Sequence, residues 1–260
     1  MSILGECALS LENEKNAREK EEAAILAKNE QLRANLLRAI SHDLRTPLTS
    51  ISGNASNLIS NSNFFDEATK NQLYTDIYDD SMWLINLVEN LLSVTRIEEG
   101  RLNLHITEDL VDDVITEALH HVNRKSVEHH ITVRHKEDYL LAKMDAKLMV
   151  QVIINIVDNA IKYTPKGSNI LIKTWKQGDK SVISIADDGD GIPDEMKERV
   201  FDMFYSGANK IADSRSLGLG LSLCRSIVNA HGGKITVSDN TPHGTVFTVT
   251  LPAGEVEIHE

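Results

Sequence analysis

The spacing of apolar residues divides the chain into two regions that meet near residue 100. Before that point, apolar residues recur every three or four positions, which is typical of amphipathic helices. Residues 10–99 contain a single proline, Pro47, and a single glycine, Gly53. After Gly100, short β-branched runs alternate with helical segments, and the other four prolines all lie in this part. The pattern predicts long helices followed by a mixed α/β domain.

The helical region carries two apolar stripes separated by a short polar break at residues 61–63. The first stripe is formed by Leu32, Leu36, Ile40, Leu44, Leu48, Ile51, Ala55 and Leu58, and the second by Leu73, Ile77, Ser81, Leu84, Val88, Leu91 and Thr95. Two helices joined by a turn form an antiparallel hairpin, and one hairpin buries only a narrow strip. We therefore expect two copies to pair as a homodimer with a four-helix bundle. Residues 1–30 are predicted to be a lead-in helix.

The second region alternates strands and helices irregularly, which favours a two-layer α/β sandwich over a doubly wound sheet. Its predicted strands are 102–106, 130–134, 139–144, 170–175, 182–186, 234–238 and 245–251. Its predicted helices are 109–122, 145–163 and one that opens near Gly218 and ends near Ala230. Asp145 is expected to cap the helix at 145–163, which ends before Pro165.

The composition excludes several classes of protein. Acidic residues outnumber basic ones by 39 to 27, a net charge of −12, so nucleic acid is not expected as a partner. There is no run of 18 apolar residues, so we expect no membrane-spanning segment in these residues. The two cysteines, Cys7 and Cys224, lie far apart without a CxxC pair, which disfavours a disulfide framework or a zinc site.

His42 lies about 180° from the centre of the first apolar stripe, so its imidazole is expected to face away from the helix's own core. At neutral pH an imidazole is mostly an uncharged nucleophile, and a carboxylate bound to one nitrogen makes the other more basic. The surrounding run is His42-Asp43-Leu44-Arg45-Thr46-Pro47-Leu48.

This run resembles the phospho-acceptor box of the sensor histidine kinases of two-component systems. Residues 39–53 and the lead-in helix are most similar to the potassium-sensing subgroup. The resemblance implies that His42 accepts a phosphoryl group, that Asp43 assists this step, and that Thr46 positions water for dephosphorylation.

The predicted helix 145–163 has an apolar face and a polar face. Asparagine is a poor helix former, so two asparagines four residues apart, Asn155 and Asn159, indicate a function for the polar face. Carboxamide oxygens suit Mg²⁺, which takes its other ligands from water and phosphate. Residues 155–163 resemble the kinases' N box. By that resemblance Asn159 holds the metal, and Asn155, Lys162 and Tyr163 contact the phosphates and the ribose of ATP.

A glycine-rich run follows the strand 182–186, and its glycines permit close approach of the backbone to a flat ligand. It consists of Asp187, Asp188, Gly189, Asp190, Gly191, Ile192 and Pro193. This run resembles the family's adenine-binding box, with Asp187 as the acceptor for the adenine amino group. The family more often has asparagine and proline where this chain has Asp188 and Asp190, a departure that we expect to be tolerated.

Four further segments complete the resemblance. Residues 201–205 resemble the F box, where Phe201 and Phe204 anchor a lid or are ordinary core aromatics. The lid follows at 206–215, in which Lys210 and Arg215 are phosphate contacts or surface charges. Gly218-Leu219-Gly220-Leu221 opens a helix whose free N–H groups suit polyphosphate, although Ser216 replaces a usual glycine. Residues 243–247 resemble the last glycine element.

Together these segments imply the core of a sensor histidine kinase. The implied domains are a dimerisation and histidine-phosphotransfer domain at 31–99, a catalytic ATP-binding domain at 101–253 of the gyrase, chaperone, histidine kinase and mismatch-repair type, and a tail at 254–260. Its cofactors are ATP and Mg²⁺, and its partner is the receiver domain of a response regulator. Phosphatase activity is a further possibility, and the parent protein is expected to be attached to the inner membrane with this part on the cytoplasmic side. Two alternatives stay open: an ATP-driven clamp that never phosphorylates itself, and a non-enzymatic dimeric scaffold.

Overall fold

A computed structural model describes residues 15, 20, 40–41, 44–98, 104–122, 128–137, 139–203, 205 and 218–255. The chain divides into two compact units, Met1–Leu84 and Ile85–Glu260. Apart from residues 15 and 20, the predicted lead-in helix lies outside the described residues, as do Leu32 and Leu36 of the first stripe.

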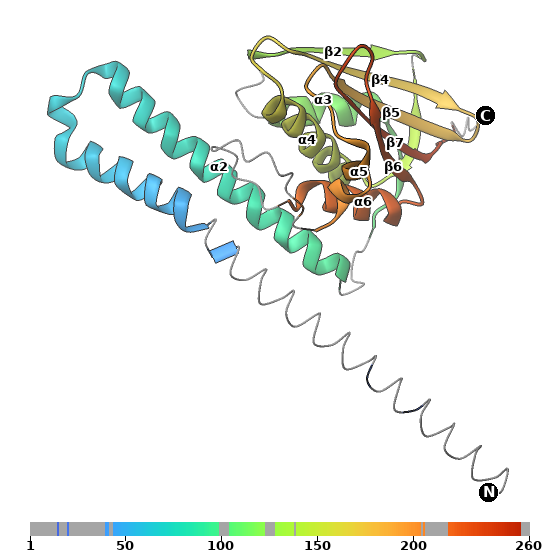
Figure 1. Ribbon diagram of the computed structural model, residues 1–260, viewed down its shortest axis with the longest axis horizontal. Helices are drawn as coiled ribbons and strands as arrows, with labels where there is room; N and C mark the ends of the chain where they lie inside the picture. Colours follow the sequence, from blue (N-terminus) through green and yellow to red (C-terminus); the bar gives the residue numbers. More distant parts are fainter. Residues whose placement is uncertain are drawn as a thin grey trace, which may run out of the picture. The chain divides into compact units, whose positions relative to one another are not determined.

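The helical region consists of two helices that run in opposite directions (Figure 1). The first covers residues 44–61 and is continuous through Pro47, and the second is α2, Glu67–Glu98. A single 3₁₀ turn, Ser62–Phe64, joins them where the sequence predicts a turn. Asp66 begins α2 by accepting a hydrogen bond from the Thr69 backbone N–H at 2.8 Å. The predicted helical hairpin is therefore confirmed.

The predicted apolar stripe of α2 is only partly correct. Leu73, Ile77 and Leu84 are half-buried as expected, but Val88 is 46% exposed. Val88 belongs to a second row of exposed side chains on α2, formed by Tyr74, Tyr78, Met82, Ile85, Val88 and Leu92. Members of this row lie three or four residues apart, so they share one side of the helix. We call this row the exposed α2 stripe. The sequence pattern alone did not separate the two sides because both are apolar.

The second region is built on a five-stranded mixed sheet with the order β2-β4-β5-β7-β6. Strand β2, His130–His135, pairs in parallel with β4, Asn169–Gln177. The other three pairings are antiparallel and involve β5 (Lys180–Asp187), β7 (Thr245–Pro252) and β6 (Lys234–Asp239). A small second sheet pairs β1, Thr107–Leu110, with β3, Leu141–Met144.

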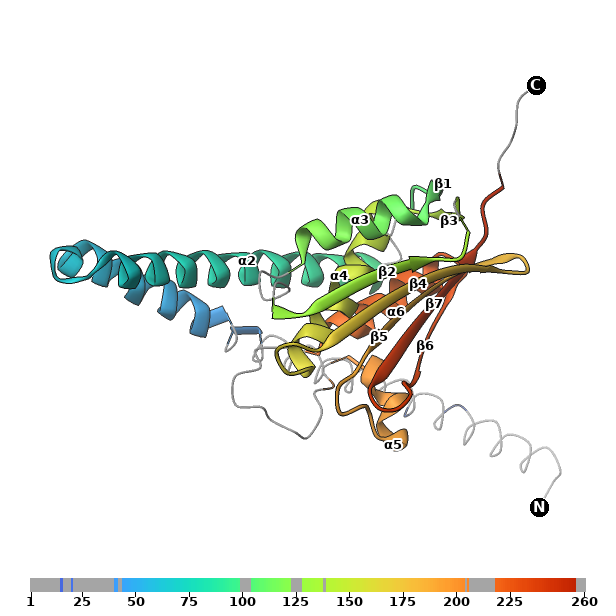
Figure 2. The same cartoon turned by 90° about the horizontal axis from the view of Figure 1, so that it is seen from above.

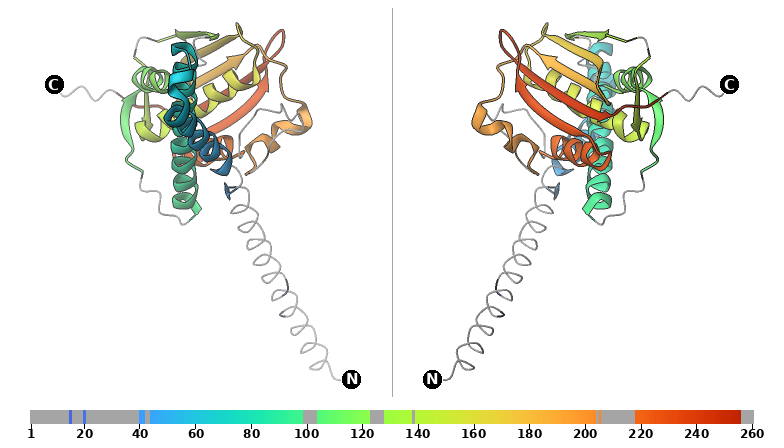
Figure 3. Two further views of the ribbon diagram at one scale, coloured as in Figure 1. Left: turned by 90° about the vertical axis from the view of Figure 1, so that its left-hand side faces the viewer. Right: turned by 90° about the vertical axis from the view of Figure 1, so that its right-hand side faces the viewer.

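Three helices form the second layer on one face of the large sheet: α3 (Val111–His121), α4 (Ala146–Tyr163) and α6 (Gly220–Ala230) (Figures 1 and 2). Figure 3 shows this arrangement from two opposite sides. The core lies between the two layers, and its fully buried side chains include Ile115, Met149, Ile153, Ile156, Ile170, Ile172, Ile183, Ile185, Leu223 and Ile227. Two short helices, α5 (Asp194–Lys197) and the 3₁₀ turn Arg199–Phe201, follow β5. The predicted two-layer sandwich is confirmed.

Most predicted elements match the structure within three residues at each end. Of the strand predicted at 102–106, residues 102–103 lie outside the described residues, and the prediction is wrong for residues 104–106, which are irregular, because β1 begins at Thr107. The helix predicted from residue 109 begins at Val111, since Asp109 and Leu110 pair with Ala142 and Leu141 of β3. Pairing between distant strands therefore outweighs the acidic residues that suggested an earlier helix start.

Candidate nucleotide-binding site

Helix α4 presents two polar nitrogens that have no hydrogen-bond partner among the described residues. They are Asn155 Nδ2 and Lys162 Nζ, and both atoms are buried. An unpaired amide or ammonium costs free energy when it is removed from water. The two residues lie seven positions apart, which is about two turns, so their side chains share one side of the helix. This side of α4 is therefore suited to an acceptor-rich, anionic ligand.

Asn159 and Tyr163 are near Asn155 and Lys162 in the sequence of α4. Asn159 is half-buried, and Tyr163 is 47% exposed at the last position of the helix. The Lys162 ammonium lies 4.9 Å from the centroid of the Tyr163 ring. The amide of Asn159 could supply an oxygen to Mg²⁺, because it stands one turn from Asn155 on the same face. Among the described residues there is no group of three or more His, Cys, Asp or Glu that could hold a metal ion.

Asp187 ends β5 and is 7% exposed. Its Oδ1 accepts hydrogen bonds from the backbone N–H groups of Gly189, at 3.0 Å, and Thr245, at 3.1 Å. These two bonds fix the orientation of the carboxyl group, and no described residue donates to its Oδ2. Burial raises the pKa of the Asp187 carboxyl, and the two backbone hydrogen bonds partly oppose this shift. Asp187 is thus a rigidly held acceptor with one oxygen available to a ligand.

The glycines after Asp187 let the loop pass close to its neighbours. At Gly189 a Cβ atom would lie 3.0 Å from Thr164 Cγ2 and 3.1 Å from Asp187 Oδ1. Gly191 has a φ of +79°, which side chains rarely adopt. Ile192 is half-buried and Pro193 is exposed.

The unusual Asp188 has a structural role. Its carboxylate accepts hydrogen bonds from the Asn169 backbone N–H at 3.0 Å and from Asn169 Nδ2 at 2.8 Å. Burial acts to raise the pKa of Asp188, but hydrogen bonds from Asn169 and from the Ser168 side chain hold the pKa below its ordinary value. The departure from the family pattern therefore ties the loop to the start of β4. The other departure, Asp190, is exposed.

The hairpin between β6 and β7 supports Asp187 from the other side. Asn240 Nδ2 donates to the Asp187 carbonyl oxygen at 2.7 Å, and His243 Nδ1 donates to the Gly189 carbonyl oxygen at 3.2 Å. Gly244, with a φ of +113°, packs so closely that a Cβ atom would lie 2.0 Å from the backbone carbonyl oxygen of Asp187. His243 and Gly244 lie in the predicted last glycine element, whereas Asn240 was not among the predicted residues. The polar turn residues between two predicted strands were the available signal.

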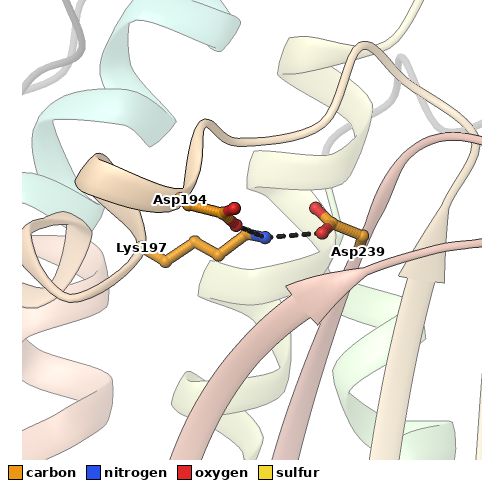
Figure 4. A network of polar contacts seen from close by, with 3 residues as sticks. All are labelled: Asp194, Lys197 and Asp239. Atoms are coloured by element: carbon orange, nitrogen blue, oxygen red, sulfur yellow. Dashed lines mark hydrogen bonds and ion pairs between the residues drawn. The ribbon is translucent and has the colours of Figure 1, made fainter.

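Figure 4 shows how the segment after the loop is fastened. Lys197 of α5 donates to Asp194 Oδ1 at 2.5 Å and to Asp239 Oδ2, at the end of β6, at 2.6 Å. Its hydrogen bond to Asp194, and then that to Asp239, raise the pKa of Lys197. The loop from Asp187 to Pro193 is therefore held at both ends, by the β6–β7 hairpin and by α5.

The start of α6 lies next to the polar face of α4. Gly218 has a φ of +64°, Leu219 is buried, and α6 begins at Gly220. A Cβ atom at Gly220 would lie 3.4 Å from Asn155 Oδ1. The first N–H groups of a helix have no partner within it, and they favour anions. The structure thus brings the predicted residues Gly220 and Asn155 together, from segments 65 positions apart. Leu221 is half-buried in the first turn of α6.

Other predicted residues fall outside this cluster. Phe201 is 5% exposed and packs edge-to-face on Phe247 with ring centroids 6.2 Å apart, which fits an ordinary core aromatic. Thr46 is exposed on the helix 44–61. Outside the described residues lie His42 and Asp43 of the phospho-acceptor run, Phe204, Lys210 and Arg215 of the predicted lid region, and Ser216. Within the described part of the chain, no helix has the length and apolarity needed to cross a membrane.

Two family models match the chain. Residues 32–100 match the His Kinase A (phospho-acceptor) domain, and residues 144–255 match the histidine kinase-, DNA gyrase B- and HSP90-like ATPase. The sensor protein KdpD of Clostridium acetobutylicum is 42% identical over 252 residues, which cover 96% of this chain and 28% of that protein. KdpD of Escherichia coli is 34% identical over 237 residues, which cover 90% of this chain and 26% of the relative.

A solved structure is also similar. The histidine kinase ThkA in complex with the response regulator protein TrrA matches with a TM-score of 0.59 and 27% identity. The match covers 85% of this chain and 61% of that one. The chain spans about a quarter of the length of the two KdpD relatives.

Proposed function

This chain belongs to the sensor histidine kinases, in the KdpD-like subgroup, and on that premise we propose that it transfers the γ-phosphoryl group of Mg-ATP to His42. The phosphoryl group would then pass to an aspartate of a response regulator. The observation that carries the proposal is the pair of buried, unpaired nitrogens on α4, Asn155 Nδ2 and Lys162 Nζ. They stand beside the glycine-rich start of α6, where a polyphosphate would supply the missing acceptors.

The ATP site would be formed as follows. Asp187 Oδ2 accepts a hydrogen bond from the amino group of adenine. Gly189, Gly191 and Ile192 lie along the plane of the base. Guanine carries a carbonyl at the corresponding position, so the same carboxylate disfavours GTP. The phosphates and ribose are bound by Asn155, Lys162 and Tyr163 and by the segment Gly218, Leu219, Gly220 and Leu221.

Asn159 would hold Mg²⁺ through its carboxamide oxygen. The metal, when bound, neutralises charge on the phosphate oxygens. The chain's own residues orient the nucleotide: Lys162 compensates phosphate charge, and the first N–H groups of α6 donate to phosphate oxygens. An imidazole nitrogen of His42 attacks the γ-phosphorus as the bond to the bridging oxygen breaks, and ADP leaves. Asp43 accepts a hydrogen bond from the N–H of the other ring nitrogen, which raises the basicity of the attacking nitrogen.

The remaining assignments follow the same premise. We assign residues 1–30 to a lead-in helix, 31–99 to dimerisation and histidine phosphotransfer, 101–253 to ATP binding, and 254–260 to a tail. Thr46 would position water when the phosphohistidine is hydrolysed. We also place the chain on the cytoplasmic side of a longer, membrane-attached protein, a proposal supported by the greater length of its KdpD relatives.

A homodimer is supported by the exposed α2 stripe. Isolated exposed apolar side chains are common, but a continuous row along one helix indicates an interface. Two copies of the helical hairpin would bury this row in a four-helix bundle. The response regulator partner is supported by the similar ThkA structure, which is a complex with such a protein.

The decisive experiment is incubation with ATP labelled on the γ-phosphate. The wild-type chain should acquire label that is lost in acid and stable in base, as a phosphohistidine is. His42→Gln should abolish the label, and His105→Gln, at an exposed histidine, should retain it. Acid-labile label on the His42→Gln variant would contradict the proposal. ATP hydrolysis without any label would favour the clamp, and absence of Mg-ATP binding would favour the scaffold.

A further inference from the structure

His231 follows the last residue of α6 and is 3% exposed. Its Nδ1 lies 2.7 Å from the Ile227 carbonyl oxygen, and its Nε2 lies 2.9 Å from the Asp145 backbone nitrogen. A carbonyl oxygen can only accept and a backbone N–H can only donate. The ring is therefore neutral, with its proton on Nδ1, and both of its nitrogens are used inside the protein.

The partner of His231 is the residue that begins α4. Asp145 Oδ1 accepts from the Leu148 N–H at 3.3 Å, which confirms the predicted helix cap, and Oδ2 accepts from the His105 N–H at 3.1 Å. The Asp145 N–H itself precedes the helix and cannot bond within it. Its bond to His231 Nε2 joins the residue just before α4 to the residue just after α6. We call this bond the α4–α6 latch.

Three contacts advance in step along the two helices. Gly220 lies against Asn155, Cys224 Sγ donates to the Val152 carbonyl at 3.7 Å, and His231 accepts from Asp145. As the residue number rises on α6, it falls on α4, so the helices are antiparallel. The latch and the nucleotide end lie about 16 Å apart along α6. The latch consequently fixes how far α6 is shifted along α4.

We propose that His231 is a positioning residue for the polyphosphate of ATP. The α4–α6 latch holds the first N–H groups of α6 at a set distance from Asn155 and Asn159, without touching the nucleotide. The inference rests on the proposed function, since it assigns the phosphates to these two helix segments. Displacement of a binding group by a fraction of an ångström is enough to weaken polyphosphate binding.

Two amide substitutions separate the two nitrogens of His231. In His231→Gln the longer side chain can reach the Asp145 N–H with its oxygen, so the latch is kept. In His231→Asn the shorter side chain can reach only the Ile227 carbonyl, so the latch is lost. We expect the Kd for Mg-ATP to rise about tenfold in His231→Asn and to stay within about twofold of wild type in His231→Gln. His120→Asn, at an exposed position of α3, is the control.

Hydrogen exchange of the Asp145 amide gives a readout that is independent of activity. In the nucleotide-free protein this amide should exchange faster in His231→Asn than in wild type or His231→Gln. Coupling between two sites is reciprocal, so Mg-ATP should slow this exchange in the wild type, a measurement that needs no variant.

Three results would overturn the inference: equal Mg-ATP affinity in His231→Asn and wild type, failure of His231→Gln to restore affinity, or Asp145 exchange that is unaffected by Mg-ATP binding. If the wild-type chain binds no ATP, the proposed function fails and the positioning role with it, while the exchange comparison among variants still reports whether the latch exists.

Discussion

The helical region and the sheet region of this chain treat their large apolar side chains in opposite ways. In the sheet region, residues such as Ile115, Met149 and Ile183 are fully buried within one copy of the chain. In the helical region, the buried apolar residues among those that the structure describes before residue 99 are Ile40 and Leu87, at 8% and 7% exposure, and Pro47. Most of the exposed large apolar side chains lie there as well, between Leu48 and Leu92.

This difference indicates that the two regions become stable by different routes. The sheet region completes its core by folding, because two layers enclose it. Two helices alone cannot enclose a core, so the helical region gains most of its stability by association. Substitutions in the exposed α2 stripe should therefore weaken association and leave nucleotide binding intact. Substitutions in the sheet region should weaken nucleotide binding and leave association intact.

The largest effect is expected from a charge in the exposed α2 stripe. Ile85→Glu would remove roughly 2 kcal/mol of apolar burial per copy, and a symmetric dimer loses it twice. The dissociation constant of the dimer should rise on the order of 10³-fold, measured by analytical ultracentrifugation over a range of concentrations.

The matched control for this substitution is the next residue, Asn86, which is exposed and polar. Asn86→Glu should leave the dimer intact, and both variants should bind Mg-ATP as the wild type does. A dimer of unchanged stability in Ile85→Glu would show that the exposed α2 stripe is not the interface.

The reverse experiment alters the sheet region at Gly244. A Cβ atom there would lie 2.0 Å from the Asp187 carbonyl oxygen, and the φ of +113° disfavours any side chain. Gly244→Ala should lower the free energy of unfolding of this region by about 3–5 kcal/mol and strongly weaken Mg-ATP binding. Urea denaturation followed by circular dichroism, together with nucleotide titration, measures both effects.

Gly178 provides the control, because it also has a positive φ, +63°, but a Cβ atom there would have open space around it. Gly178→Ala should cost only about 1–2 kcal/mol and should leave Mg-ATP binding unchanged. If the two alanine variants were equally stable, the close approach of Gly244 to Asp187 would not be the cause of the destabilisation in Gly244→Ala.

Local signals in the sequence were sufficient for most of the fold. The cap at Asp145 and the two faces of α4 depend on residues within one helix, so periodicity and residue type identify them. The start of β1 was missed because its pairing with β3 joins residues more than thirty positions apart. The exposed α2 stripe was missed because the pattern shows which positions are apolar and not how many neighbours cover each side.

In the candidate site, too, residues with local signals were predicted and residues that act through distant contacts were not. Asn155, Lys162, Asp187 and the glycines were predicted from short runs, because their residue types suit the proposed chemistry. The side chains that hold them in place, Asn240 and His231, act through backbone atoms 53 and 86 positions away. A hydrogen bond to a backbone atom does not depend on the partner's residue type, so no pair of residue types in the sequence indicates it.

The next effect in size concerns Asp187. Asp187→Asn should raise the Kd for Mg-ATP roughly 10- to 100-fold, because a charged acceptor is lost, and should narrow the preference for ATP over GTP. The control is Asp190→Asn at an exposed position of the same loop. Titration of both nucleotides by calorimetry measures these changes, and an unchanged preference would remove Asp187 from base recognition.

The pH dependence of the same site follows from the raised pKa of Asp187. A raised folded-state pKa favours the folded protein below the unfolded pKa, about 3.9, and this contribution is lost as the pH rises through the folded-state value. The affinity for nucleotide should depend on pH in the opposite direction, since the ionised carboxylate is the proposed acceptor of the adenine amino group. Mg-ATP affinity should therefore fall with acidification at a higher pH than for an ordinary aspartate, and this component should be absent in Asp187→Asn.

The smallest effect is expected at Asn240, which acts on the nucleotide only through Asp187. Asn240→Ala removes the donor to the Asp187 carbonyl and should cost about 1–2 kcal/mol of stability, with a rise in the Kd for Mg-ATP of about three- to fivefold. Asn240→Asp keeps the shape but sets a carboxylate oxygen against that carbonyl, so it should be worse than alanine. Asn229→Ala, at an exposed position of α6, should change neither quantity. If Asn240→Asp were as stable as the wild type, this hydrogen bond would not support Asp187.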